Sequence, residues 1–268
     1  MFKLNKAQLR WLAMLTMVLD HFAEMFLKPG LEGSSEILTK LHLSEPAAEI
    51  LCNVFISLGT FTGTVMIYFL IEGYFYTKNL KKYMLRLLLF GMISQVPFYL
   101  AFGVPALNIL FALAVCLGAI YVHYHVPDSG KKNLMILGLF AINCFTDWTI
   151  MAVPITLYLS EAFEPVQEKP CFKVKPDRLR LAFIKSFILM LIIHVISLGS
   201  FPKGVSTTCG FVLAAVLISR FYDESKANKT GTEEQGYIAK TFNKYFFYIF
   251  YPLHLVILSG VYKLLIPS

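Results

Sequence analysis

Residues 51–76 decide the fold: LCNVFISLGTFTGTVMIYFLIEGYFY. Within this segment only Glu72 carries a formal charge at neutral pH. An apolar run of about 18 residues or more is long enough to cross a bilayer as a helix, and comparable runs recur along the chain. The whole chain is 57% hydrophobic and 15% charged, whereas soluble domains have about 25% charged residues. These features predict an all-α, polytopic integral membrane helical bundle.

We expect about nine transmembrane helices in a single domain that covers residues 1–268. The first apolar segment has no small-residue cleavage site and contains Asp20 and His21, so we expect it to remain as the first helix. Asp147 and Trp148 are nearly all that separates the fifth and sixth helices. The expected spans cover residues 7–27, 51–76, 83–102, 107–125, 132–147, 148–163, 181–199, 204–221 and 243–264.

The distribution of positive charge orients these spans. With the N-terminus in the cytoplasm, 20 of the 24 Lys and Arg residues fall on the inner side. The four on the outer side are Lys28, Lys40, Lys203 and Lys263. Because inner segments are enriched in Lys and Arg, this asymmetry supports a cytoplasmic N-terminus and a multi-pass protein of the inner (plasma) membrane.

The net charge of +7 is explained by topology and by contact with anionic membrane lipids, so we expect no nucleic-acid partner. The five cysteines form no C-x-x-C pair and are interpreted as free thiols. Gly59 and Gly63 form a G-x-x-x-G pattern, which is typical of a close helix-packing face. Two hydrophilic stretches, 164–178 and 223–236, interrupt the spans on the inner side, and the second is expected to be mobile.

The first expected helix contains an unusual set of ionisable groups. Residues 10–21 read RWLAMLTMVLDH. The eleven residues from Arg10 to His21 correspond to three helical turns plus about 20°, so the two side chains share a face and lie about 16 Å apart along the axis. Carboxylates within a span cost at least about 2.5 kcal/mol and normally face partners or a polar cavity. Asp20, His21 and Glu24 therefore form either a structural hydrogen-bond cluster or a catalytic group in which Glu24, at i+3, orients the imidazole.

Several segments resemble the TraX family, which is associated with N-terminal acetylation of pilin. They are LRWLAMLTMVLDHF at the start, EGYFYTKNLKKYMLRLLLFGMISQVPF (72–98), LNILFAL (107–113) and YPLHLVIL (251–258). TraX-like proteins in turn resemble a superfamily of transmembrane acyltransferases, whose first span begins with Arg or Lys, ten residues and His. Here that pattern corresponds to Arg10 and His21. The resemblance implies a cytoplasmic acetyl-CoA donor and a peptide N-terminus or an envelope glycan as acceptor.

The predicted site follows from this chemistry. Arginine binds phosphate through its planar fork, and a histidine with an ordinary pKa near 6.5 suits a general base. We expect His21 to act with Asp20 and Glu24 as the catalytic group; a covalent acetyl-histidine intermediate is the competing route. The groups expected to bind the donor are Arg10, Arg86, Lys82 and Tyr83.

The resemblance also suggests residues that line the acceptor cavity. Glu72 stands where the superfamily has a serine, and Tyr251 and His254 share one face of the last span at i, i+3. Gln95 and Asn108 lie in the matching blocks. The other four histidines, His42, His123, His125 and His194, are interpreted as structural, and no cluster has metal-ligand spacing.

Two further classes of function compete with the enzyme. A small-solute transporter or channel lined by the charged first helix would carry flux without coenzyme A and would ordinarily show an internal repeat, which is not visible here. An assembly factor that keeps the scaffold without catalysis is the third possibility.

Overall fold

A computed structural model describes residues 3–166, 172–222 and 237–266, with the backbone alone for 237–244. The polar stretch 223–236 and Cys171 lie outside the described residues. The described chain is nearly all helical, and its one sheet is a two-stranded hairpin. The chain forms two compact units, so the expectation of a single domain stays a prediction. Unit 1 contains Met1–Val65, Val96–Gly103 and His194–Ser268, and unit 2 contains Met66–Gln95 and Val104–Ile193.

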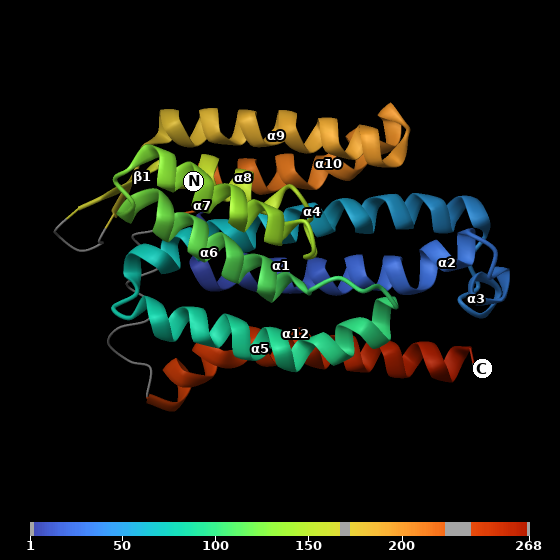
Figure 1. Cartoon of the computed structure of the whole chain (residues 1–268). Coiled ribbons are helices and arrows are strands. Elements are labelled where there is room, and N and C mark those ends of the chain that lie inside the picture. Colours follow the sequence, from blue (N-terminus) through green and yellow to red (C-terminus); the bar gives the residue numbers. More distant parts are fainter. Residues whose placement is uncertain (1–2, 167–171, 223–236, 267–268) are drawn as a thin grey trace. The chain divides into compact units, whose positions relative to one another are not determined.

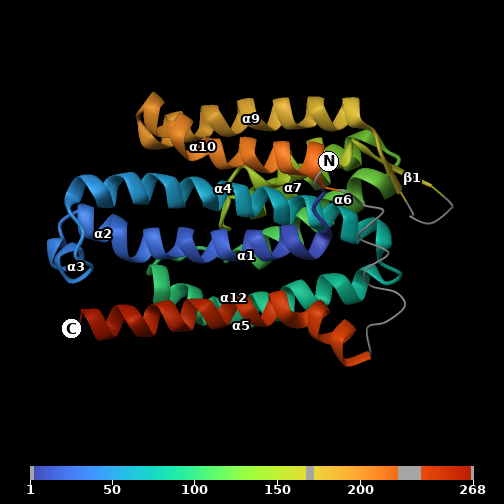
Figure 2. The same ribbon diagram turned by 180° about the vertical axis from the view of Figure 1, so that it is seen from behind.

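Unit 1 is built around the first helix. α1 (Lys6–Phe22) continues directly into a π-helical segment, η1 (Ala23–Leu27) (Figures 1 and 2). The short helices α2 (Lys28–Leu31) and α3 (Ser35–Lys40) follow. The unit also holds the first part of α4 (Glu45–Tyr76), the end of α5 (Leu80–Phe102), the end of α9 (Pro176–Leu198), α10 (Phe201–Val216), η2 (Leu217–Phe221) and α12 (Tyr237–Leu265).

The sequence fixes where α1 begins through a capping box. The Asn5 side chain accepts a hydrogen bond from the Gln8 backbone N–H at 2.8 Å, and the Gln8 side chain accepts one from the Asn5 N–H at 2.9 Å. These two bonds satisfy donors that the first turn of a helix leaves without intrahelical partners. Just before the cap, the Leu4 N–H donates to the Phe221 carbonyl at 2.7 Å. These hydrogen bonds hold the N-terminal end of α1 against the end of η2.

Small and hydroxyl side chains bring the helices of unit 1 close together. Thr16 of α1 and Thr62 of α4 share a hydrogen bond of 2.7 Å. The Ser57 hydroxyl of α4 accepts from the Gly210 N–H of α10 at 2.8 Å, and a Cβ at Gly210 would overlap the Ser57 carbonyl. Such contacts are the usual means of packing helices in lipid, where burial of apolar surface gives no driving force between them.

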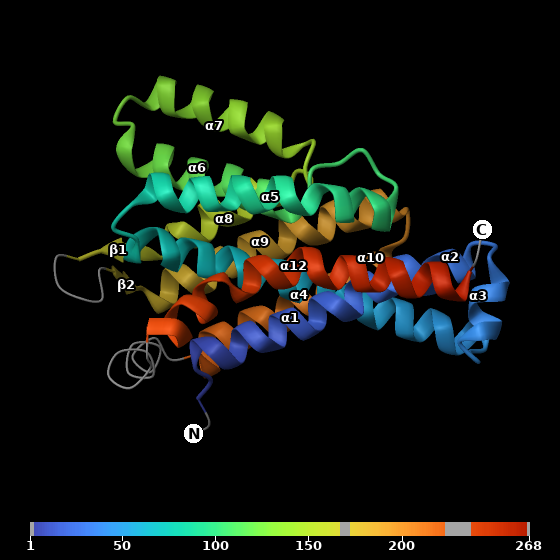
Figure 3. The ribbon, with the colours of Figure 1, turned by 90° about the horizontal axis from the view of Figure 1, so that it is seen from below.

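Unit 2 contains the middle of the chain. α6 (Ile109–His125) and α7 (Ser129–Asn143) run side by side (Figure 3), and α6 also packs against α8 (Ala152–Ser160). The short strands β1 (Phe163–Pro165) and β2 (Phe172–Val174) pair antiparallel, with Glu164 opposite Lys173. The start of α9 follows this hairpin. The end of α4 and most of α5 complete the unit.

The structure supports a membrane protein and changes part of the predicted topology. Five described helices are long and apolar enough to cross a membrane. The predicted sixth span, 148–163, is wrong: α8 has nine residues, which rise about 14 Å against a hydrocarbon core of about 30 Å. Before α8 the chain turns through Trp148 (φ 61°) and Ile150 (φ 68°). The total of nine spans and the side of the N-terminus stay predictions. The described spans are Glu45–Tyr76, Leu80–Phe102, Pro176–Leu198, Phe201–Phe221 and Tyr245–Leu265.

Candidate active site

The first and last helices of unit 1 bring two buried histidines into contact. His21 lies on the face of α1 that also buries Leu9, Ala13 and Met17, because positions four residues apart share one face of a helix. His21 Nδ1 is 2.7 Å from His254 Nε2 on α12, and the two rings lie nearly parallel, with centroids 4.9 Å apart. The structure thus joins two residues that are 233 positions apart in the sequence.

The hydrogen bond of His254 Nδ1 shows which nitrogens of the two histidines carry protons. His254 Nδ1 is 3.0 Å from the Phe250 carbonyl. Because a carbonyl oxygen only accepts, Nδ1 carries a proton, and Nε2 of the neutral ring is the acceptor. His21 therefore donates from Nδ1, and its Nε2 keeps a lone pair. In this tautomer His21 Nε2 is basic and is not used in the hydrogen bond to His254.

Asp20 supplies a negative charge on that side of His21. Its Oδ2 is 4.0 Å from His21 Nε2. The carboxylate packs against α4 at Gly59, where a Cβ atom would overlap it. Gly59 therefore marks a close approach of helices, as the G-x-x-x-G pattern predicts, and it also makes room for the Asp20 side chain. A carboxylate at this distance stabilises an imidazolium more than a neutral imidazole.

Glu24 does not take the orienting role expected for it. Its carboxylate pairs with Lys28 at 2.9 Å, and within the described residues the hydrogen-bond partner of the His21 ring is His254. The α-helical i, i+3 relation fails because Glu24 lies in η1, where the π-helical turn is wider and shifts each side chain around the axis. The partner that orients His21 comes from α12 instead.

Aromatic side chains of unit 1 enclose the pair. Phe102 meets the His21 ring edge-on at 5.1 Å, and the fully buried Tyr251 lies 6.3 Å from it. Tyr251 and His254 thus both flank His21, as neighbours on one face of α12. Arg10 is half-buried on α1, three turns before His21. The His21 side chain is buried, and the low dielectric of buried surroundings strengthens the electrostatic interactions there.

The other predicted donor-binding residues lie in unit 2. The Arg86 guanidinium stacks over the Tyr83 ring at 5.4 Å, and the Arg86 Nε is buried without a hydrogen-bond partner among the described residues. Tyr83 in turn packs against Gly73, next to the buried Glu72. Lys82 is exposed. The structure therefore groups Arg86, Tyr83 and the 72–73 segment in one place, and their roles in binding stay predictions.

Gln95 and Asn108 have a structural role in this geometry. The Asn108 amide donates to the Gly91 carbonyl at 2.7 Å and to Gln95 Oε1 at 2.9 Å. The Asn108 oxygen caps α6 by accepting from the Leu110 N–H at 3.1 Å, and Gln95 Nε2 donates to the Ala106 carbonyl at 2.8 Å. The amides fasten α5 to the start of α6. That Gln95 and Asn108 line the acceptor cavity stays a prediction.

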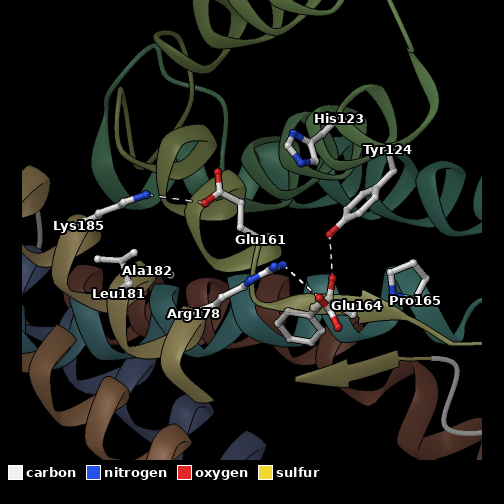
Figure 4. Close-up of a pocket in the computed structure, with 10 residues that line it drawn as sticks. His123, Tyr124, Glu161, Glu164, Pro165, Arg178, Leu181, Ala182 and Lys185 are labelled. Carbon is white, nitrogen blue, oxygen red and sulfur yellow. Dashed lines mark hydrogen bonds and ion pairs between the residues drawn. The ribbon is translucent and has the colours of Figure 1, made fainter. Parts of the chain in front are cut away.

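Sequence reasoning missed a charged cavity beside the hairpin of unit 2 (Figure 4). Glu164 accepts a hydrogen bond from Lys175 at 2.6 Å and forms an ion pair with Arg178 at 3.2 Å, and Lys185 lies 3.8 Å from Glu161. The hydrogen bond from Lys175, with its charge and that of Arg178, holds the pKa of Glu164 below its ordinary value. The signal available in the sequence was the density of Lys and Arg between 173 and 185, which topology alone could also explain.

His194 and the described cysteines have no part in these clusters. His194 hydrogen-bonds Thr208 at 2.9 Å, and the four described cysteines are free, as expected. In the described ranges no three His, Cys, Asp or Glu side chains are placed to hold a metal ion.

Fold and site together define a class: a helical membrane protein with a buried, hydrogen-bonded pair of histidines. Comparison with known families then places the chain: the model of the TraX protein family matches residues 5–262, and the chain belongs to this family. A similar protein is the probable fimbrial assembly protein FimC, serogroup H1, of Dichelobacter nodosus. It is 28% identical over an alignment of 270 positions, which covers 94% of this chain and 93% of the relative. No solved structure matches the chain.

Proposed function

We propose that this protein is a membrane-embedded acyltransferase of the inner (plasma) membrane. It transfers an acetyl group from cytoplasmic acetyl-CoA to an amine or hydroxyl acceptor, and His21 is the general base. The observation that carries the proposal is the hydrogen-bonded chain from His21 through His254 to the Phe250 carbonyl, which leaves a lone pair on His21 Nε2. A buried base fixed in one tautomer suits proton transfer from an acceptor.

The reaction needs only groups that the site or the substrates supply. The acceptor nitrogen or oxygen forms a bond to the carbonyl carbon of the thioester while its proton moves to His21 Nε2. The resulting imidazolium donates to His254 Nε2 and faces the Asp20 carboxylate at 4.0 Å. When the C–S bond breaks, the coenzyme A thiolate takes that proton and leaves as the thiol, which restores neutral His21.

The family, rather than the site, suggests which acceptors to test. The TraX family is linked to pilin and fimbrial assembly, and the relative is named a probable fimbrial assembly protein. A peptide N-terminus, such as that of a pilin subunit, is therefore the first acceptor to test, with an envelope glycan second. A free peptide amine is a good nucleophile when it is neutral, which is the form that His21 would deprotonate as it attacks.

The test is acetyl transfer by the purified full-length protein. Labelled acetyl-CoA is incubated with peptides that carry a free N-terminus and with glycans, and the labelled product is measured. Wild type and His42→Asn, which changes an exposed histidine with φ 53°, should turn over alike, because asparagine tolerates this backbone conformation. His21→Ala should lose activity. If a stably folded His21→Ala is as active as wild type, His21 is not the base.

A further inference from the structure

Two neighbouring cavities of unit 2 share a wall. One cavity, of about 530 Å³, lies between the ends of α4 and α6, and the other, of about 480 Å³, lies between β1 and the start of α9. Tyr124 and Pro165 line both cavities. These two residues form the wall between the cavities, and the Tyr124 hydroxyl is held by the Ser160 and Phe163 carbonyls at 2.7 and 3.1 Å. A ligand that contacts both cavities must therefore pass over Tyr124 or Pro165.

The first cavity is aromatic, with one cation. Tyr74, Tyr121, Tyr124 and His125 line it together with Lys78. The rings are held by one another: Tyr121 stacks on His125 at 4.4 Å, Tyr74 stacks on Tyr124 at 6.0 Å, and the Tyr74 hydroxyl is 3.1 Å from His125 Nδ1. Ring faces held in this way suit a flat heteroaromatic group, because base–aromatic stacking depends on the π-face rather than on sequence-specific hydrogen bonds.

The second cavity is lined by two cations, Arg178 and Lys185, and by two carboxylates, Glu161 and Glu164, and Lys175 adds a third cation at Glu164. Arg178 and Lys185 extend toward Glu164 and Glu161 from one face of α9 (Figure 4). Glu164 is shared between Arg178 and Lys175, so one carboxylate serves two cations. Arg178 makes its contact with Glu164 through one guanidinium nitrogen, which leaves further N–H donors in a geometry that matches phosphate oxygens.

We propose that the paired cavities bind an adenine nucleotide, with the base in the aromatic cavity and the phosphates at Arg178 and Lys185. This inference rests on the proposed function and deepens it, because an adenosine bisphosphate is the nucleotide end of the coenzyme A donor. The nucleotide site is then distinct from the residues that the sequence analysis expects to bind the donor, which are Arg10, Arg86, Lys82 and Tyr83.

Because one cavity is aromatic and the other carries cations, the two together should bind a nucleotide more tightly than a phosphate that has no base. Inorganic pyrophosphate and the headgroup of an anionic phospholipid would use Arg178 and Lys185 but would gain nothing from the stacked tyrosines. A nucleotide gains from both cavities. Its affinity should therefore fall when either cavity is changed, whereas the affinity of a simple phosphate should fall only with the charged cavity.

Binding of adenosine 3′,5′-bisphosphate to the full-length purified protein tests the site. The variants are Tyr121→Ala, which removes a side chain in a residue that is 45% exposed, and Arg178→Gln. Each should weaken binding about tenfold, and Tyr121→Phe, which keeps the ring, should retain wild-type affinity. The matched controls are Tyr99→Ala and Arg180→Gln, which change exposed side chains outside both cavities, and Arg86→Gln tests the rival placement.

The same measurement with inorganic pyrophosphate and with phosphatidylglycerol vesicles separates the sources of phosphate. Pyrophosphate should bind at least tenfold more weakly than the nucleotide and should respond to Arg178→Gln alone. The proposal would be overturned if pyrophosphate bound as tightly as the nucleotide, or if phosphatidylglycerol vesicles displaced the nucleotide as well as unlabelled nucleotide does. So would nucleotide binding that depends on Arg86 and not on Tyr121 or Arg178.

Photolabelling of the wild type gives a readout that needs no variant. 8-Azidoadenosine 3′,5′-bisphosphate should label the peptides that contain Tyr74 or Tyr121, and labelling confined to other segments would overturn the proposal. Binding and labelling are measured without acetyl transfer. Nucleotide binding without transfer therefore counts against the proposed function alone, and transfer that ignores Tyr121 and Arg178 counts against the nucleotide site alone.

Discussion

Replacing His254 with alanine should slow acetyl transfer without removing the base. His254 Nε2 accepts the 2.7 Å hydrogen bond that fixes His21 in the tautomer with a basic Nε2. During the reaction this bond is made to a charged imidazolium, and hydrogen bonds to charged groups contribute about 1.5–3 kcal/mol. Since about 1.4 kcal/mol corresponds to a factor of ten in rate, kcat should fall roughly ten- to a hundredfold. The KM for acetyl-CoA should stay close to that of wild type, because His254 does not touch the donor in this mechanism.

The assay is steady-state acetyl transfer in detergent, with kcat and KM measured separately for each variant. His254→Gln keeps an acceptor oxygen and should recover part of the lost kcat. The matched control is His194→Asn, which removes another buried histidine that hydrogen-bonds Thr208 in the same unit; its kcat should remain near the wild-type value. The positioning role of His254 would be refuted if a folded His254→Ala kept the wild-type kcat, or if the substitution raised KM without lowering kcat.

Two further changes test the surroundings. Gly59→Ala places a Cβ against the Asp20 carboxylate, so this variant should lower kcat about tenfold and reduce the thermal midpoint of unfolding. Gly260→Ala is the control, because the space around its Cβ is open, and it should change neither quantity. Equal effects of the two variants would contradict the close approach of Asp20 to Gly59. The pKa of Glu164 is lowered chiefly by the hydrogen bond from Lys175, so the stabilisation from this pair is present above the ordinary carboxyl pKa and is lost as the pH falls through the lowered one. The protection factors of the hairpin amides, which correct each measured exchange rate for its intrinsic pH dependence, should therefore fall in acid for wild type and much less for Glu164→Gln. Parallel pH profiles of the two proteins would count against this account.

Much of the helical architecture follows from the sequence because long apolar segments have few other ways to satisfy their backbone in a membrane. The predicted span 51–76 lies within α4, and 83–102 lies within α5. The prediction failed at residues 148–163, where hydropathy alone does not reveal that the chain turns at Trp148 and enters a strand at Phe163. Local backbone geometry, rather than composition, ended that helix.

The candidate site was predictable only in part. The periodicity of α1 places His21 on the buried face, and the family resemblance singles out His254. Their direct hydrogen bond joins distant segments, and no local pattern encodes such a contact. The role expected for Glu24 failed because the sequence gives no sign of the π-helical turn at Ala23–Leu27. The cavity at Arg178 was missed because a segment rich in Lys and Arg is equally consistent with a cytoplasmic loop and with a ligand site.

The most direct measurement of the central claim is single-turnover acetyl transfer by His21→Ala, with and without added imidazole. General-base assistance typically contributes about 10²–10⁴-fold, so the variant should be slower than wild type by that order. Imidazole, supplied in the space that the side chain leaves, should restore part of the rate in proportion to its concentration. A folded His21→Ala that transfers acetyl at the wild-type rate without imidazole would contradict the account.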